Sequence, residues 1–192
     1  MGSPVPWADP VAATQALGAD LSRFVTEAGQ QDWALVWAAG CGVVATGRSD
    51  LQAETNLLER FLSGVRRQHP QGDGAFFLAS SAGGVYAGSS KPPFSELTTP
   101  RPLSAYGEAK LEQEELATRI LGNTVPVIVG RLSNLYGPGQ NLAKAQGLVS
   151  LLCLAAATRR ALNLFVPLDT LRDYLYVDDA AVMIVSLLMA TV

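Results

Sequence analysis

Residues 76–88, FFLASSAGGVYAG, and residues 104–110, SAYGEAK, carry the strongest indication of fold and chemistry in this chain. An apolar run that ends in serines and glycines is typical of a buried strand leaving a parallel sheet. A helix would place Tyr106 and Lys110 on one face, because they are four residues apart. A nearby ammonium would lower the pKa of a tyrosine from about 10 and let it exchange a proton with an alcohol. Taken alone, this spacing is common enough on surface helices to favour a chance pairing.

Around these segments, strand-like and helix-like stretches alternate, which predicts an α/β fold with a doubly wound parallel sheet. Strands are expected at residues 34–38, 75–79, 125–129 and 162–166. Helices are expected within residues 7–30, at 52–67, 104–121 and 147–161, and from Asp178 onward. On the helix at 104–121, the stretch 113–115, QEE, is expected to face solvent.

Composition favours an intracellular protein that binds neither nucleic acid nor membranes. The net charge of −3 provides no basic surface for phosphates or anionic lipids. The apolar stretches 147–158 and 180–192 are shorter than the roughly 20 residues that a spanning helix needs. Cys41 and Cys153 lack metal-ligand spacing, so we expect no metal site and a reducing, cytoplasmic location. His69 precedes a proline in a turn-like segment, which argues against histidine-based catalysis.

From about Trp33 to Val182 the chain resembles the extended short-chain dehydrogenase/reductases, in particular the NAD(P)-dependent epimerase/dehydratase family that acts on nucleotide sugars. Six segments match in the family's order, and their order makes the resemblance specific. They are WALVWAAG (33–40), ETNLLERFL (54–62), FFLASSAGGVYAG (76–88), PPFSELTTPRPLSAYGEAK (92–110), VIVGRLSNLYGPGQN (127–141) and RDYLYVDDAA (172–181).

The resemblance implies a Rossmann-like fold, NAD or NADP as cofactor, and a nucleotide sugar or another small carbonyl or hydroxyl compound as substrate. It implies three groups of site residues. The catalytic group is Tyr106, Lys110 and Ser81; the cofactor-binding group is Ala38, Ala39, Gly40, Asn56, Ser80, Tyr106 and Lys110; the substrate-binding group is Ala82, Asn134 and Arg172.

Several of these positions have a second interpretation. The family's hydroxyl residue would align with Ala82, so Ser81 is expected to replace it only if the glycine-rich turn shifts. Ser80 and Ser81 would otherwise satisfy backbone groups at a strand end. Asn56 would otherwise bond a neighbour on its own helix. Arg172, which resembles an arginine that clamps the nucleotide diphosphate, would otherwise pair with a nearby aspartate.

The chain also departs from the family pattern, which normally opens with a strand, a GxxGxxG turn and a helix. The GCG at residues 40–42 lacks that spacing. We therefore expect a single partial Rossmann-like domain over residues 1–192, with 132–177 contributing to the substrate region. We expect it to lack the first strand–helix unit and part of the C-terminal substrate region, and so to bind dinucleotide weakly.

The leading functional hypothesis is a nucleotide-sugar epimerase that works by transient oxidation with Tyr106 and Lys110. Dehydratases of the family usually carry an Asp–Glu pair where this chain has Gly83 and Gly84, which disfavours elimination. Two alternatives stay open: a carbonyl reductase of the same superfamily acting on a non-sugar compound, and a non-catalytic dinucleotide-sensing or scaffold protein.

The resemblance further implies a homodimer, formed through the helices that carry Asn56 and Tyr106. The apolar residues Leu111, Leu116 and Ile120 would supply contacts across such an interface. The same residues could equally face their own sheet.

Overall fold

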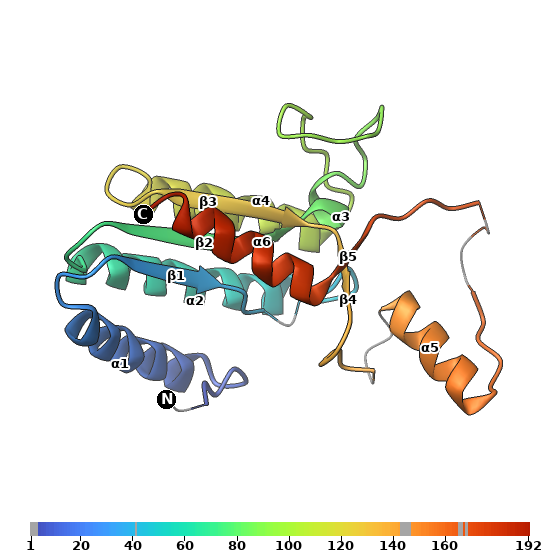
Figure 1. Ribbon diagram of the computed structural model, residues 1–192, viewed down its shortest axis with the longest axis horizontal. Helices are drawn as coiled ribbons and strands as arrows, with labels where there is room; N and C mark the ends of the chain where they lie inside the picture. The colour runs from blue at the N-terminus through green and yellow to red at the C-terminus, as the bar shows by residue number, and fades with distance from the viewer. Residues whose placement is uncertain (1–3, 41, 143–146, 165–166, 168) are drawn as a thin grey trace.

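The computed structural model describes residues 4–40, 42–142, 147–164, 167 and 169–192. Its helices and strands alternate along the chain as the sequence predicts (Figure 1). The helices are α1 (Pro10–Ala28), α2 (Arg48–Gln68), α3 (Ala82–Val85), α4 (Ala105–Leu121), α5 (Leu148–Thr158) and α6 (Val177–Met189). The strands are β1 (Trp33–Trp37), β2 (Gly74–Ser81), β3 (Val127–Leu132), β4 (Asn134–Tyr136) and β5 (Tyr174–Tyr176).

The main sheet is parallel and has the order β1-β2-β3. Its register aligns Ser81 with Leu132, so β2 and β3 end at the same level, whereas β1 ends at Trp37, which pairs with Leu78 three residues before the end of β2. This parallel arrangement confirms the predicted fold class. The carboxyl ends of the strands form one edge of the sheet, where ligands bind in open α/β folds.

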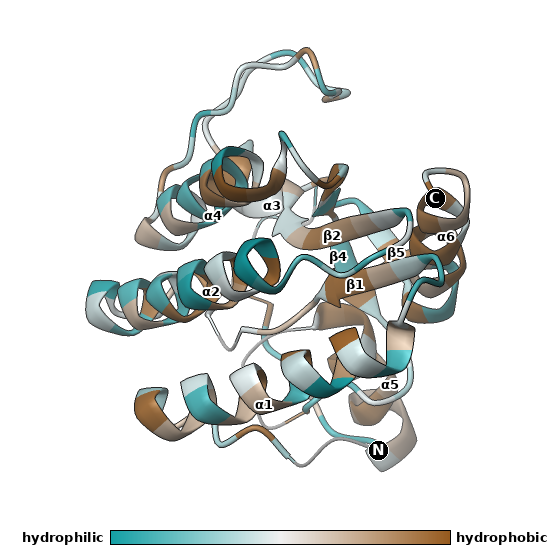
Figure 2. Cartoon of the chain, turned by 90° about the vertical axis from the view of Figure 1, so that its left-hand side faces the viewer, coloured by the Kyte–Doolittle hydropathy of each residue, from teal (hydrophilic) through white to brown (hydrophobic). Residues whose placement is uncertain are grey.

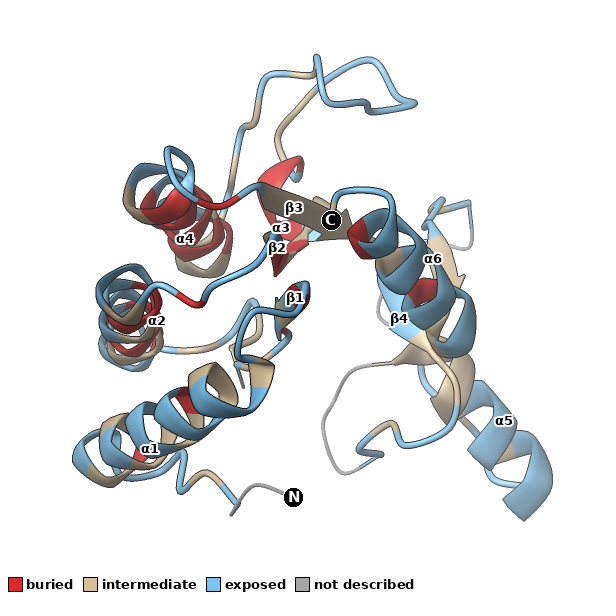
Figure 3. Ribbon diagram, turned by 60° about the vertical axis from the view of Figure 1, so that its left-hand side comes forward, coloured by how far each residue is buried: buried red, intermediate tan, exposed pale blue. Residues whose placement is uncertain are grey.

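The helices α1, α2 and α4 lie along one face of the sheet, and α6 lies on the other (Figures 1 and 3). Side chains alternate between the faces of a strand with a period of two. Trp33 and Trp37 of β1 therefore point toward α2 together with Phe76 and Leu78 of β2, and all four are buried.

The face covered by α2 and α4 holds the larger hydrophobic core. Leu58, Leu62 and Val65 follow each other at helical spacing on α2 and are fully buried. From α4, Leu116 and Leu121 complete the same cluster. Leu116 thus faces its own sheet, which removes it from the residues available for a dimer interface.

The opposite face has a smaller core around Ala75, Phe77 and Leu188. Helix α6 is apolar around most of its circumference (Figure 2). Only Ala180 and Leu188 of that helix are buried. The rest of its apolar side chains are half-buried or exposed (Figure 3).

The last third of the chain departs most from the predicted elements. A second, two-stranded parallel sheet joins β4 to β5, and the sequence patterns did not indicate either strand. Each has only three residues, too few for a periodic signal. The strand predicted at 162–166 is wrong for residues 162–164, which are irregular, while 165 and 166 lie outside the described residues.

Helix α5 ends at Thr158, three residues earlier than predicted, and has no buried residue. Within the part of the chain that the structure describes, no helix combines the length and apolar character needed to span a bilayer.

Candidate active site

The predicted Tyr–Lys helix is α4, which begins directly after the cap residue Ser104. The Ser104 hydroxyl accepts a hydrogen bond from the backbone N–H of Gly107 at 3.2 Å, which fixes the first turn of the helix. That turn packs against the short helix α3, where a Cβ added to Gly107 would lie 2.3 Å from the carbonyl oxygen of Gly84. Two glycines therefore let α3 and α4 approach closely enough to bring Tyr106 to the end of β2.

The structure brings Ser81 and Tyr106 together. Ser81 is the last residue of β2, and its hydroxyl accepts the backbone N–H of Gly84 at 3.2 Å. The same hydroxyl hydrogen-bonds the phenol of Tyr106 and favours its ionised form. Ala82 is the next residue and begins α3.

Lys110 lies one turn further along α4, with its Nζ 5.8 Å from the centroid of the Tyr106 ring. The ammonium is buried and donates to the carbonyl oxygen of Ala79 and to Oε1 of Gln113, each at 3.2 Å. Gln113 in turn donates to the Thr55 hydroxyl at 3.3 Å. These contacts hold the lysine between β2, α4 and α2.

The predicted lowering of the Tyr106 pKa is wrong for this structure. Burial raises the pKa of Tyr106 above its ordinary value, against the Ser81 hydrogen bond, and the Glu54 carboxylate raises it further. Burial likewise lowers the pKa of Lys110, with Glu54 and Glu114 acting in the opposite direction. Tyr106 is thus a neutral phenol near pH 7.

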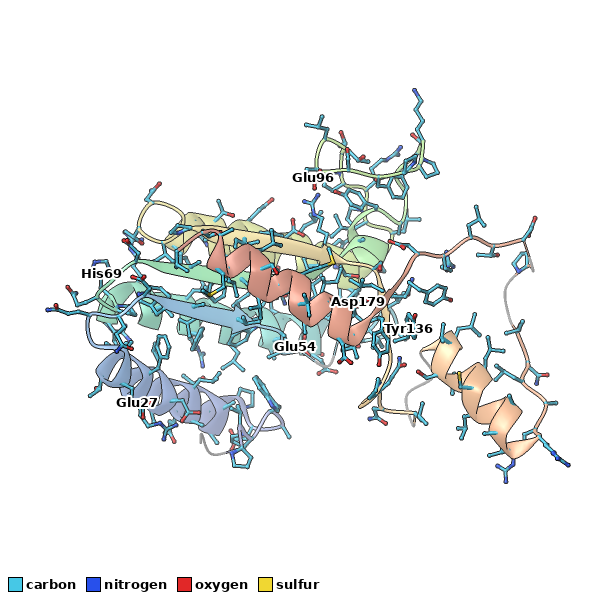
Figure 4. The ribbon with its side chains drawn as sticks, in the orientation of Figure 1. Glu27, Glu54, His69, Glu96, Tyr136 and Asp179 are labelled. Atoms are coloured by element: carbon cyan, nitrogen blue, oxygen red, sulfur yellow. The ribbon has the colours of Figure 1, made fainter. Side chains whose placement is uncertain are left out.

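Glu54 is a member of this cluster that the sequence patterns did not single out. Its carboxylate accepts the backbone N–H of Gly42 at 3.0 Å and lies close enough to act on both Tyr106 and Lys110. Figure 4 shows Glu54 toward the end at which the strands terminate, with His69 at the opposite end. Its position between Leu51 and Leu58, on the apolar stripe of α2, was an available signal.

The predicted cofactor residues divide into two groups. Ala38, Ala39 and Gly40 follow β1 directly, and Gly40 has a φ of 131° that favours glycine. Asn56 is exposed, and its Oδ1 accepts from Nε2 of Gln52 at 3.1 Å, which matches its alternative interpretation. Asn56 comes two residues after Glu54, and a separation of two residues corresponds to about 200° of rotation around a helix. Asn56 therefore points away from the side of α2 that carries Glu54.

Ser80 hydrogen-bonds within the protein as well. Its side chain is buried, and its hydroxyl hydrogen-bonds Oε1 of Glu114 at 2.5 Å. The prediction that residues 113–115 face solvent is wrong for Gln113 and Glu114, which are buried, and right for Glu115. A single helix turn thus carries two inward polar residues next to an outward one.

The predicted substrate residues line one groove of about 1630 Å³ beside the outer edge of β3. Ala82, Asn134 and Arg172 all contribute to it. Asn134 donates through Nδ2 to the carbonyl oxygen of Asp173 at 2.8 Å, which ties β4 to the start of β5. Arg172 is exposed and, among the described residues, forms no ion pair with Asp169 or Asp173.

Comparison with known proteins decides the family. The sequence profile of the NAD dependent epimerase/dehydratase family matches residues 17–191. The chain belongs to this family. A dTDP-L-rhamnose 4-epimerase from Burkholderia thailandensis is 37% identical over 99 residues, which are 50% of this chain and 27% of that protein. A dTDP-4-dehydro-6-deoxyglucose reductase from Escherichia coli is 31% identical over 106 residues, 53% of this chain and 32% of that protein.

Solved structures of epimerases share the fold. UDP-glucuronic acid 4-epimerase from Bacillus cereus, in complex with UDP-glucuronic acid and NAD, aligns with a TM-score of 0.69 and 27% identity over 88% of this chain and 52% of its own. UDP-glucose 4-epimerase from Thermotoga maritima aligns with a TM-score of 0.71 over 87% of this chain and 53% of its own, at 24% identity. The chain thus spans about half the length of these structures.

The family is NAD-dependent, and the residues near Tyr106 fit the nicotinamide riboside part of such a cofactor. The turn after β1 passes close to the phenol, since a Cβ on Gly42 would lie 3.5 Å from the Tyr106 ring. Lys110 is a donor and Glu54 an acceptor for hydroxyl groups. A carboxylate would repel phosphate, so this fit concerns the ribose and ring of the cofactor.

Proposed function

We propose that this chain carries the acid–base site of a nucleotide-sugar epimerase-like oxidoreductase of the NAD dependent epimerase/dehydratase family. The observation that supports the proposal most is the meeting of Ser81, Tyr106 and Lys110 at the carboxyl end of the sheet. These three residues come from β2 and α4 and are brought together by the close approach of α3.

In this proposal Tyr106 exchanges a proton with the oxygen of the reacting sugar carbon. Because burial keeps the phenol neutral, it is ready to give its proton to a carbonyl oxygen. The Ser81 hydroxyl donates to the phenolate that remains and lowers its energy. In the reverse direction the same pair accepts the proton of a sugar hydroxyl.

Lys110 supplies positive charge beside the phenol and a donor for a ribose hydroxyl. A bound nicotinamide would accept and return the hydride of this oxidation and reduction. The residues proposed to hold it are Ala38, Ala39, Gly40, Tyr106 and Lys110, with Glu54 as a hydroxyl acceptor. The proposed cofactor is NAD or NADP.

The groove beside β3 is the proposed substrate site. Asn134 and Arg172 line it, and the planar guanidinium of Arg172 is suited to a diphosphate. The epimerase and reductase relatives support a nucleotide sugar as the substrate class. Gly83 and Gly84 leave no carboxylate pair at the start of α3, which favours epimerisation or reduction over dehydration.

The proposal keeps three further expectations. Residues 1–192 form a single partial Rossmann-like domain in which 132–177 contribute to substrate binding. The protein acts in the cytoplasm. It forms a homodimer through α2 and α4, to which the half-buried Leu111 remains available, whereas Ile120 packs against the core that holds Leu116.

Replacement of the phenol tests the proposed function. The 192-residue chain, and the chain extended upstream in the same reading frame, are incubated with NAD and UDP- or dTDP-sugars. Epimer formation is followed by chromatography, and reduced nicotinamide by absorbance. The Tyr106→Phe variant is expected to lose about 10²–10⁴-fold in turnover, the usual contribution of a positioned acid or base.

Thr26→Val is the control, because it removes an exposed side-chain hydroxyl from α1, away from the proposed site. It should retain turnover. Equal turnover in Tyr106→Phe and in the unsubstituted chain would reject Tyr106 as the acid. Absent turnover at both chain lengths, across all these sugars, would support the non-catalytic dinucleotide-sensing alternative.

A further inference from the structure

A second buried polar cluster lies one helical turn beyond Lys110 and is centred on Glu114. The carboxylate of Glu114 accepts from the Ser80 hydroxyl and from Nε and Nη2 of Arg131, the last at 2.6 Å. Glu114 is 7% exposed, so this pair is shielded from solvent on the carboxylate side. It links three elements, β2, β3 and α4, at the end of the sheet where Tyr106 lies.

Arg131 connects this cluster to the wall of the groove. Its Nη1 donates to the Tyr86 hydroxyl at 2.5 Å, and its guanidinium lies 5.1 Å from the centroid of the Tyr86 ring. The Tyr86 hydroxyl donates in turn to the carbonyl oxygen of Ser95, in the loop above α3. Hydrogen bonding to Glu114 raises the pKa of Arg131, so the guanidinium stays charged. Arg131 and Glu114 both line the groove.

The charge of Glu114 also acts on Lys110. The groups that face Lys110 are Glu54 from α2, Tyr106, Gln113 and Glu114 from α4, and the Ala79 carbonyl from β2. Both glutamates favour its charged form against the effect of burial. Glu114 therefore interacts with two cations, Arg131 and Lys110. The more fully Arg131 neutralises the carboxylate, the weaker is the attraction between the carboxylate and Lys110.

We infer that Glu114 is a positioning residue that couples the charge of Arg131, in the groove wall, to the protonation of Lys110. The inference rests on the proposed function for the catalytic meaning of Lys110. Its electrostatic content rests on the contacts of Glu114 with Arg131 and on the place of Glu114 four residues after Lys110 on the same helix. An anion in the groove that engages Arg131 would leave Glu114 less neutralised and hold Lys110 more firmly in its charged form.

Two substitutions test the coupling, because they are expected to shift the pKa of Lys110 in opposite directions. Glu114→Gln removes the carboxylate and leaves the Arg131 cation nearby, so the pKa of Lys110 should fall. Arg131→Gln leaves the carboxylate without its cation, so the pKa of Lys110 should rise. In the double variant Glu114→Gln/Arg131→Gln both charges are gone, and the two shifts should largely cancel.

The readout is competitive acetylation of lysines across a pH series, followed by mass spectrometry. Only the neutral amine reacts, so a change of one unit in pKa changes the reactive fraction by about tenfold at fixed pH. The exposed Lys91 in the same sample is the internal reference. Glu112→Gln and Arg119→Gln remove exposed charges from the same helix and should leave Lys110 unchanged.

A purely structural role for Glu114 would loosen the site in both variants and make Lys110 more reactive in each. Shifts of the same sign, or no shift in Arg131→Gln, would therefore overturn the inference. If Glu114→Gln does not fold, Arg131→Gln alone decides by the direction of its shift. The labelling requires neither substrate nor dinucleotide, so its outcome is independent of whether the proposed activity is found.

Discussion

The two faces of the main sheet differ in how completely they are covered. Toward α2 and α4, the side chains of Leu58, Leu62 and Phe76 are fully buried. Toward α6, Val182, Val185 and Met189 are 65%, 57% and 70% exposed. One face of the sheet is therefore closed by well-packed helices, whereas the helix on the other face leaves much of its own apolar surface exposed (Figure 3).

The two faces also differ in which part of the proposed active site they support. Ser81, Tyr106 and Lys110 belong to β2 and α4, and their positions depend on the packed face. The groove with Asn134 and Arg172 borders the open side, where α6 and the β4–β5 sheet meet. The proposed acid–base residues thus lie on the well-packed part of the molecule, and the proposed substrate contacts lie on the part with fewer buried residues.

The largest expected effect comes from equal truncations on the two faces. Leu62→Ala creates a cavity in a fully buried position, and unfolding free energy should fall by about 2–5 kcal/mol. Leu187→Ala on α6, where the leucine is 49% exposed, should cost about 1 kcal/mol or less. Urea unfolding followed by circular dichroism measures both. Similar losses in the two variants would show that the α6 face is as well packed as the other.

A smaller effect concerns the charge that the packed face buries. Burial lowers the pKa of Lys110 in the folded protein, whereas the unfolded chain keeps its ordinary value of 10.5. Between those two values the unfolded state binds more protons, so stability should rise with pH, by at most about 1.4 kcal/mol per pH unit. The stabilisation is lost as the pH falls through the folded value. Lys110→Met lacks this proton and should lack the slope.

The unfolding free energies of the unsubstituted chain and of Lys110→Met are measured by urea titration from about pH 7 to about pH 10. Their difference at each pH gives the contribution of Lys110. Tyr106 titrates in both proteins, so its contribution largely cancels. A difference that is constant across this range would mean that Lys110 has the same pKa folded and unfolded.

The smallest effect on stability is expected on the open face. Val182, Val185 and Met189 lie on one side of α6, and replacing all three by Lys should change the unfolding free energy by roughly 0.5 kcal/mol per site. Exposed apolar patches promote association, so the triple variant should sediment with less self-association than the unsubstituted chain.

Gln15→Lys/Ser22→Lys/Thr26→Lys, at three exposed positions of α1, adds the same charge away from the proposed α2–α4 interface and serves as the control. It should leave self-association unchanged. Unfolding of the α6 variant would show instead that these side chains are needed for the fold.

Several site features followed from sequence pattern, and others did not. Tyr106 and Lys110 were predicted because a helical spacing of four is a local property. Ser81 was only one of two interpretations, since a one-residue shift of the glycine turn decides which side chain meets the phenol. Glu114 was predicted to face solvent because a run of polar residues on a helix usually does, yet it is buried by Arg131 from a distant strand.

By itself, the sequence determined the alternation of strands and helices, the family, and the helix that carries the Tyr–Lys pair. These follow from short-range periodicity and from local spacing, which a chain carries before it folds. Only the tertiary structure decided that Ser81 meets Tyr106, that burial keeps the phenol neutral, and that Glu54 and Glu114 face Lys110. Such contacts depend on how closely α2, α3, α4 and the strand ends approach one another, and distance in space is not encoded in distance along the chain.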